Sequence, residues 1–198
     1  MSNTLDYYNR NAAAFTESTR YTDMHRIQDR FLSKLKEGDA ILDFGCGSGR
    51  DTKFFLERGY RVTAADGSAE CVRLAGAYTG IDVKEMLFQD LDEVCTYDGI
   101  WACASILHLP KEELLPVFRK MCTALKFPGV IYTSFKHGEF EGERNGRYFT
   151  DFTEAAFRDF IGEIPELTVT ECWITDDARP GREDEKWLNL LLQKQEIS

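Results

Sequence analysis

The stretch from residue 40 to residue 51, AILDFGCGSGRD, constrains this chain more than any other. Three apolar residues lead into Asp43, and Gly45, Gly47 and Gly49 then alternate with other residues, which is the pattern of a buried strand that turns tightly into a helix. Glycine has no Cβ and reaches positive φ angles without steric cost, so the main chain at such a turn can approach a ligand closely. The stretch therefore predicts a ligand-binding loop.

The spacing of these glycines disfavours two common nucleotide sites. A Walker phosphate loop needs Lys and then Ser or Thr after its last glycine, and Arg50 and Asp51 stand there instead. A dinucleotide turn needs its third glycine three residues after its second, whereas Gly49 follows Gly47 by two. Asp51 in the first helical turn would also repel a pyrophosphate. An ATP or GTP site is disfavoured, and so is an NAD(P) site.

A second acidic residue lies where a nucleoside would need it. Residues 60–65 predict a buried strand that ends at Asp66, Gly67 and Ser68. An acid at the carboxyl end of the second strand, roughly 20 residues past a glycine loop, is placed to accept both hydroxyls of a ribose. Ser68 is expected to cap the next helix, which leaves Asp66 for the ribose.

Two segments resemble those of a known family. Residues 42–49 read Leu-Asp-x-Gly-x-Gly-x-Gly, which resembles motif I of the class I S-adenosylmethionine-dependent methyltransferases, and residues 97–108 resemble their fourth-strand segment. The resemblance covers nearly the whole chain and is nearest to small bacterial tellurite-resistance-like methyltransferases. It implies an α/β fold with a Rossmann-like, doubly wound sheet of seven strands, mostly parallel with an antiparallel last strand. It also implies S-adenosylmethionine as cofactor and S-adenosylhomocysteine as product.

The resemblance implies which residues meet the cofactor. The glycine loop would lie against the methionine and ribose portions, with Asp43 facing the amino-acid end. In the family an acid after the third strand hydrogen-bonds the adenine amino group; Asp90 matches that position, with Leu91 or Phe88 flanking the ring. The other residues expected at the cofactor are Tyr8, Arg20, Gly45, Cys46, Gly47, Gly49, Arg50, Asp66, Gly67, Ser68, Ala104 and Ser105.

Methyl transfer from a sulfonium is a one-step displacement, so alignment of the reactants is the enzyme's main task. Well-oriented systems gain about 7–11 kcal/mol in this way, which makes a dedicated base optional. His108 follows the fourth strand, where it is a candidate base near neutral pH. The alternative is that its ring hydrogen-bonds the backbone and shapes the wall of the site. Two other function classes stay open: a catalytically silent cofactor-binding regulatory or partner protein, and an NAD(P)-dependent oxidoreductase.

The glycine-rich segment 136–150 predicts a loop at the same edge of the sheet, where loops carry substrate specificity. Arg147 and Tyr148 are its candidate substrate residues, because an arginine binds a carboxylate or phosphate by forked hydrogen bonds. The alternative is that the arginine pairs with neighbouring acids. The same alternatives hold for Arg144, Arg179 and Arg182.

The 198 residues, 43% of them hydrophobic, suit a single methyltransferase domain over 1–198, with 1–38 as a helical cap over the cofactor. The net charge of −10 disfavours nucleic acid and favours a small-molecule substrate.

Six cysteines without a C-x-x-C pair and three separated histidines predict no metal site. The chain shows no secretion signal and no apolar run of about eighteen residues, so we expect a cytoplasmic protein without membrane contacts. The oligomeric state is left open.

Hydrophobic spacing places the remaining elements. Apolar residues recur at helical spacing over 3–17 and 23–36, which predicts two helices before the first strand. Alternating strands and helices then predict a parallel sheet covered on both faces, followed by a terminal hairpin with its turn at 176–182. Strands are expected at 40–44, 60–65, 81–83, from 97, 130–136, 167–175 and 185–193, and helices at 50–58, 69–78, from Pro116 and at 153–161.

Overall fold

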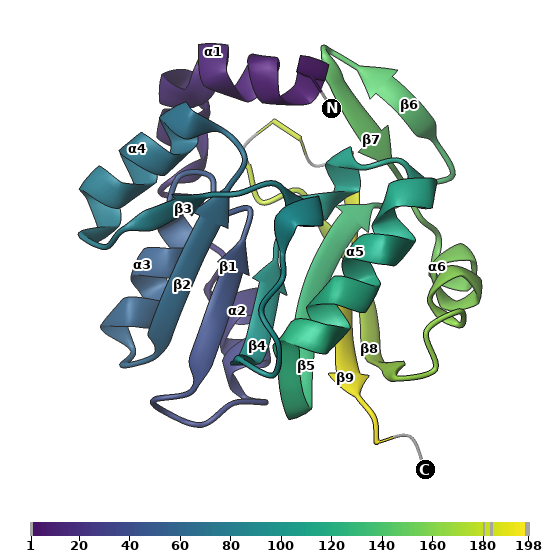
Figure 1. Ribbon diagram of the computed structural model, residues 1–198. Coiled ribbons are helices and arrows are strands. Elements are labelled where there is room, and N and C mark those ends of the chain that lie inside the picture. Colours follow the sequence, from purple (N-terminus) through teal and green to yellow (C-terminus); the bar gives the residue numbers. More distant parts are fainter. Residues whose placement is uncertain (1, 180, 183, 197–198) are drawn as a thin grey trace.

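The computed structural model describes residues 2–179, 181–182 and 184–196. Its main sheet consists of β1 (Ala40–Phe44), β2 (Arg61–Asp66), β3 (Val83–Glu85), β4 (Tyr97–Ala102), β5 (Leu125–Lys136), β8 (Leu167–Asp176) and β9 (Lys186–Lys194). These seven strands lie in the order β3-β2-β1-β4-β5-β9-β8 (Figure 1). Strands β1 to β5 pair in parallel, whereas β9 runs antiparallel to both β5 and β8. The predicted Rossmann-like sheet with an antiparallel last strand is confirmed.

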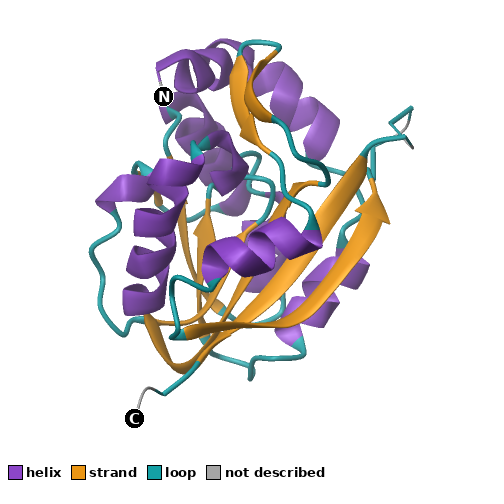
Figure 2. Ribbon diagram, turned by 90° about the vertical axis from the view of Figure 1, so that its right-hand side faces the viewer, coloured by secondary structure: helices purple, strands orange, loops and turns teal. Residues whose placement is uncertain are grey.

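Helices cover both faces of this sheet, as Figure 2 shows from the side of β8. One face carries α2 (His25–Leu32), α3 (Arg50–Glu57) and α4 (Ala69–Thr79), and the other carries α5 (Lys111–Ala124) and α6 (Glu154–Ile161). A parallel sheet between two helical layers buries both sides of its strands, which therefore read as nearly continuous apolar runs.

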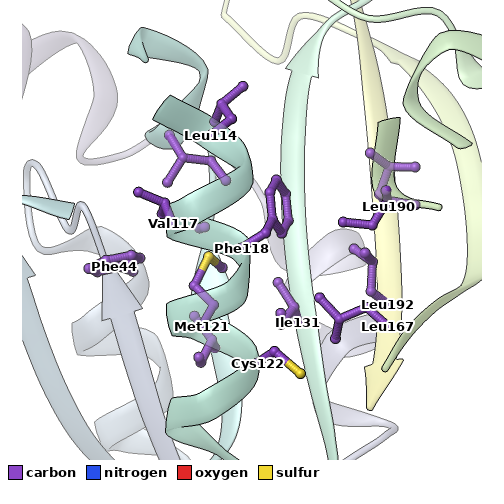
Figure 3. Packing of buried hydrophobic residues seen from close by; sticks show 14 of the residues in the cluster. Phe44, Leu114, Val117, Phe118, Met121, Cys122, Ile131, Leu167, Leu190 and Leu192 are labelled. Atoms are coloured by element: carbon purple, nitrogen blue, oxygen red, sulfur yellow. The ribbon is translucent and has the colours of Figure 1, made fainter. Parts of the chain in front are cut away.

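The larger core lies between α5 and the sheet. Val117, Phe118 and Met121 are fully buried, and their helical spacing forms one apolar stripe along α5. Figure 3 shows this stripe beside Ile131 of β5 and Leu190 of β9. Burial of each such side chain contributes about 1.5–3 kcal/mol. The stripe thus fixes α5 against the strands whose ends carry the site.

Helix α5 begins earlier than the proline pattern predicts. We expected Pro116 to start the helix, but α5 starts at Lys111 and contains Pro116. The carbonyl of Pro110 accepts hydrogen bonds from the amides of Glu113 and Leu114, so this earlier proline precedes the first turn. The hydrogen bond that Pro116 cannot donate is offset by burial of the apolar stripe around it.

The segment expected as a loop over 136–150 contains a second, two-stranded sheet. Its strands are β6 (Glu141–Arg144) and β7 (Arg147–Thr150), which pair antiparallel. Asn145 and Gly146 between them have φ angles of 51° and 76°, the left-handed pair that a two-residue hairpin turn requires. The prediction of a loop was wrong, because the Asn-Gly turn signal lies among other glycines and mixed charges that suggest irregular structure.

Other boundaries shift by a few residues. Strand β5 starts at Leu125 instead of residue 130, because Leu125 already pairs with Tyr97 of β4 before a register shift. The terminal strands β8 and β9 form the expected hairpin. Pro180, within the turn expected at 176–182, lies outside the described residues.

Helix α1 (Ser2–Thr19) and the β6–β7 hairpin lie across the end of the sheet toward which the parallel strands point (Figure 1). The amide of Tyr148 in β7 donates a hydrogen bond to Oγ1 of Thr4 in α1, at 3.0 Å. Helix α2 instead packs into the core, where Phe31 is fully buried beside Phe55. Of the cap predicted over 1–38, α1 covers the strand ends and α2 covers a sheet face. Within the described part of the chain, no helix has the length and apolarity to cross a membrane.

Candidate functional site

A cavity of about 830 Å³ lies at the carboxyl ends of the parallel strands, beneath α1. Its volume is within the range of about 300–1,000 Å³ that is usual for ligand pockets. Ligands of open parallel sheets bind at this edge. The predicted site residues that line it are Tyr8, Gly45, Cys46, Gly47, Arg50, Asp66, Gly67, Ala104, Ser105, His108 and Arg147.

The glycine loop after β1 has the conformation that its sequence predicts. Gly45, Gly47 and Gly49 have φ angles of 91°, 53° and 76°, all in the left-handed region. A Cβ on Gly45 would lie 2.4 Å from the Cβ of Ser105, and one on Gly47 would lie 3.0 Å from the Phe15 ring. The loop is therefore held between the end of β4 and helix α1 at a distance that only bare backbone allows.

Asp66 at the end of β2 is fixed by two backbone amides. Its carboxylate accepts hydrogen bonds from the amides of Gly47, at 2.9 Å, and Ser68, at 2.8 Å. Burial raises the pKa of Asp66 above its ordinary value, while these two amides act in the opposite direction. The glycine loop and the β2 carboxylate, which the sequence predicts to share a ligand, are thus bonded to each other on the cavity surface.

Asp43 lies behind the glycine loop instead of on the cavity surface. Its side chain is 2% exposed and accepts a hydrogen bond from Oγ1 of Thr52. Burial, and next the negative charge of Asp51, raise the pKa of Asp43 to about 8. Asp51 itself pairs with Arg50, and despite the opposing effect of burial this cation holds the pKa of Asp51 below its ordinary value. The assignment of Asp43 to the amino-acid end of the cofactor stays a prediction.

The end of β4 meets the glycine loop through strained backbone. Ala104 has a φ angle of 50°, which is uncommon for a residue with a side chain, and its amide donates to Oγ of Ser134 at 2.9 Å. The next residue, Ser105, donates from Oγ to the carbonyl of Phe44 at 2.6 Å. Left-handed backbone outside glycine is concentrated at functional sites. Both residues line the cavity.

His108 is hydrogen-bonded through both ring nitrogens. Nδ1 lies 2.6 Å from the carbonyl oxygen of Tyr148, and Nε2 lies 2.8 Å from the phenol oxygen of Tyr8. A carbonyl only accepts, so Nδ1 carries the proton and Nε2 accepts from the Tyr8 hydroxyl. Burial lowers the pKa of His108 to about 4. The ring is neutral near pH 7, and its basic nitrogen is already engaged.

The loop after β3 places apolar side chains on the cavity and leaves the predicted acid outside its lining. Leu87 and Phe88 line the cavity, and the Phe88 ring packs edge-on against Phe44 with centroids 4.9 Å apart. Asp90 is exposed at the end of a short 3-10 turn, and Leu91 is buried in the core against α5. Of the two proposed adenine flanks, Phe88 reaches the cavity, while Leu91 points into the protein.

Three further predicted residues lie outside the cavity lining. Gly49 is the N-cap of α3, and a Cβ there would lie 2.9 Å from Thr79 of α4, so this glycine allows the two helices to pack closely. Ser68 caps α4 as predicted, accepting a hydrogen bond from the amide of Cys71. The Arg20 guanidinium lies 4.1 Å above the ring of Tyr78, outside the cavity lining.

The two predicted substrate residues separate because side chains alternate along β7. Arg147 and Phe149 line the cavity, whereas the Tyr148 hydroxyl donates to Glu141 on β6 at 3.2 Å. Tyr148 contributes its backbone carbonyl, which holds His108. Strand alternation is visible only once the hairpin is recognised, and this explains why the sequence did not separate the two residues.

The cavity also holds residues that the sequence did not assign to it. Leu5 and Phe15 of α1 line it, and the Leu5 side chain lies over Gly67. The sequence showed them as part of an apolar helical stripe, which is equally typical of packing in a core. No feature of the sequence indicated that Leu87 would line the cavity.

No group of three or more His, Cys, Asp or Glu side chains suited to a metal ion was found in the described residues.

Residues 41–129 match a family model described as a methyltransferase domain. YqeM of Bacillus subtilis strain 168, a curated protein whose methyltransferase name is provisional, is 29% identical over 119 residues. That alignment covers 54% of this chain and 48% of YqeM, so the chain spans about half the length of this relative.

Solved structures share the fold over nearly the whole chain. The 1,6-didemethyltoxoflavin-N1-methyltransferase of Burkholderia thailandensis, with bound 1,6-didemethyltoxoflavin and S-adenosylhomocysteine, has a TM-score of 0.77 at 22% identity, over 97% of this chain and 85% of that one. The magnesium protoporphyrin IX methyltransferase of Synechocystis PCC 6803, with bound S-adenosylhomocysteine, has a TM-score of 0.73 at 16% identity, over 96% and 97%. Identities this low establish the fold alone. The narrower resemblance to tellurite-resistance-like enzymes stays a prediction.

Proposed function

We propose that this chain is a class I S-adenosylmethionine-dependent methyltransferase that transfers a methyl group from S-adenosylmethionine to a small-molecule acceptor. The match of residues 41–129 to a methyltransferase-domain model and the shared fold support this proposal. One observation carries the proposal. The glycine loop after β1 and the carboxylate after β2 line the same cavity and are joined by the hydrogen bond from Gly47 to Asp66. A nucleoside whose ribose meets Asp66 would lie directly against bare backbone.

The residues present fit the nucleoside. A carboxylate offers about four lone-pair directions, and the amides of Gly47 and Ser68 use two of them at Asp66. The remaining two can accept the ribose hydroxyls. Leu87 and Phe88 supply an apolar wall for the adenine ring. The contact of Asp90 with the adenine amino group rests on the family resemblance.

When bound, S-adenosylmethionine supplies an electrophilic methyl group on a sulfonium, which a nucleophile displaces in one step. The chain's own contribution is orientation, for which about 7–11 kcal/mol is available. Gly45 and Ala104 present the main chain of the β1 and β4 ends along one wall of the cavity. Leu5 and Phe15 of α1 add apolar side chains to the cavity lining, next to Gly67 and Gly47.

His108 is better suited to position Tyr8 than to remove a proton. Its pKa of about 4 is far below neutral, and its Nε2 lone pair accepts the Tyr8 hydroxyl. The bond from Nδ1 to the Tyr148 carbonyl ties this pair to the β6–β7 hairpin. We therefore assign His108 a positioning role. We assign no residue of the chain as a general base.

Isothermal titration calorimetry with S-adenosylhomocysteine tests the cofactor assignment. We expect the wild type to bind it, and Asp66→Asn to bind about 10- to 100-fold more weakly, because hydrogen bonds to a charged group contribute about 1.5–3 kcal/mol. Asp159→Asn, an exposed position on α6 with the same charge change, is the matched control. Circular dichroism confirms that each variant is folded.

The outcomes separate the alternatives. A folded wild type that gives no heat with S-adenosylhomocysteine, or that binds NADH in its place, contradicts the proposal. Equal affinity of wild type and Asp66→Asn refutes the ribose assignment alone. Transfer of a labelled methyl group is then screened on small metabolites, chalcogen oxyanions and tRNA. Binding without transfer to any acceptor supports a silent regulatory or partner protein, and transfer to tRNA overturns the small-molecule assignment.

A further inference from the structure

Arg147 differs from the other cations of the late segments that line the cavity. Each of those has a carboxylate partner close by: Lys136 pairs with Asp177 and Glu185, Arg144 with Asp151, Arg179 with Asp177, Arg182 with Glu185, and Lys186 with Asp176. Among the described residues, Arg147 has none. Arg26 at the rim also lacks one, but its side chain is exposed, so water solvates its charge.

The surroundings of Arg147 hold its guanidinium group without neutralising it. The group lies 4.5 Å from the ring centre of Tyr7 and 5.1 Å from that of Phe149. Its one hydrogen bond in the described structure runs from Nη1 to the Tyr8 hydroxyl and is long, at 3.5 Å. The Nε–H group is buried and has no partner there. A buried, unpaired donor on a cation is unfavourable, so this position is completed best by an acceptor from outside.

The hydrogen-bond chain around Arg147 leaves only donors for an incoming group at this point of the cavity. The Tyr148 carbonyl orients His108, His108 accepts the Tyr8 proton, and the Tyr8 oxygen accepts from Arg147. Tyr8 therefore has no proton left to donate, and Arg147 supplies the donors at this point of the wall. Its remaining N–H groups form a planar fork, which matches two oxygen atoms of one carboxylate.

We propose that Arg147 anchors a carboxylate of the methyl acceptor, so that the substrates of this protein are small carboxylic acids. The statement that the bound acid is the methyl acceptor rests on the proposed function, but the anion site itself does not require the cofactor. Two of the neighbouring carboxylates are already neutralised, because Asp151 is paired with Arg144 and Asp177 with Arg179 and Lys136. Tyr8 also links the anchor to α1, the helix that covers the cavity.

The test compares acids with their neutral amides. Acetate, benzoate and 4-hydroxybenzoate are titrated beside acetamide, benzamide and 4-hydroxybenzamide by calorimetry, with and without saturating S-adenosylhomocysteine. We expect the wild type to bind at least one acid about 10-fold or more tightly than its amide. Arg147→Met should abolish this preference, and Arg147→Lys should keep part of it, because Lys retains the charge without the planar fork. Arg158→Met on α6, which removes an exposed arginine outside the cavity, is the control and should keep all of it.

Each outcome decides one assignment. The proposal is overturned if no acid is preferred over its amide, or if Arg147→Met retains the preference in a folded protein. It is also overturned if Arg147→Met weakens S-adenosylhomocysteine instead, since Arg147 would then serve the cofactor. An acid preference that needs Arg147, in a protein that does not bind S-adenosylhomocysteine, supports the anion site and refutes the methyltransferase proposal.

Discussion

Replacing Gly45 by alanine tests how closely the β1 and β4 ends approach each other. Gly45 has a φ angle of 91°, and an added Cβ would lie 2.4 Å from the Ser105 Cβ and 3.0 Å from its Oγ. Ser105 cannot move aside easily, because its buried Oγ donates to the Phe44 carbonyl at 2.6 Å. The variant therefore combines backbone strain with overpacking at the centre of the sheet.

Gly80→Ala is the matched control for this variant. Gly80 ends α4 with a φ angle of 78°, and a Cβ there would meet nothing within 4 Å. Both variants share the cost of a left-handed alanine, about 1–2 kcal/mol, and the same small change in the unfolded chain. Only Gly45→Ala adds overpacking, which typically costs about 1–3 kcal/mol. The free energy of unfolding should thus fall by about 1–3 kcal/mol more for Gly45→Ala than for Gly80→Ala.

Urea denaturation followed by tryptophan fluorescence measures this difference. Trp101 is fully buried on β4, so its emission reports loss of the central sheet. Equal losses for the two variants would show that the loop relaxes without strain, and that close packing of backbone against β4 is not what requires glycine at position 45. An unchanged urea slope confirms that the comparison concerns stability and not a change in the unfolded state.

Two further predictions concern buried charge. The pKa of His108 is lowered to about 4 from 6.5. Between these two pH values the unfolded chain takes up a proton that the folded chain does not. The contribution of the neutral His108 ring to the free energy of unfolding is therefore complete above pH 6.5 and is lost as the pH falls toward 4. His108→Gln should reduce the fall in unfolding free energy between pH 7 and pH 4 by up to about 3 kcal/mol, and an unchanged pH profile would contradict a buried neutral ring. Asp51→Asn should lower the free energy of unfolding by about 3–5 kcal/mol, because Arg50 is left buried without its partner. Glu154→Gln, in an exposed pair with Arg158, should change it by less than about 1 kcal/mol. Similar losses for the two variants in thermal or urea unfolding would refute this contrast.

Much of the fold follows from local pattern. The apolar run before Asp43, the glycines after it and the acid at Asp66 predict two parallel strands and the loop between them, and the structure contains both. The sequence placed the glycine loop, Asp66 and Ser105 at one site because the carboxyl ends of parallel strands meet at one edge of a sheet. These are the residues whose position depends mainly on strand order.

The predicted site residues whose side chains lie outside the cavity lining are positioned by contacts between distant elements. Arg20 lies on Tyr78 instead of the cavity, and the Tyr148 side chain turns away from Arg147, because helix rotation and strand alternation are set by the partners that each element meets. Asp90 remains outside the cavity lining for the same reason, since the turn after β3 directs Leu87 inward.

The sequence by itself determined the alternation of strands and helices in the main sheet, the bare backbone after β1 and the acid after β2, because each of these arises from neighbours along the chain. Only the tertiary structure decided which charges are neutralised and which are not. Arg144 and Arg147 look alike in the sequence, yet Asp151 pairs with the first and aromatic rings surround the second. That difference is electrostatic and depends on distances across the fold, which no local pattern encodes.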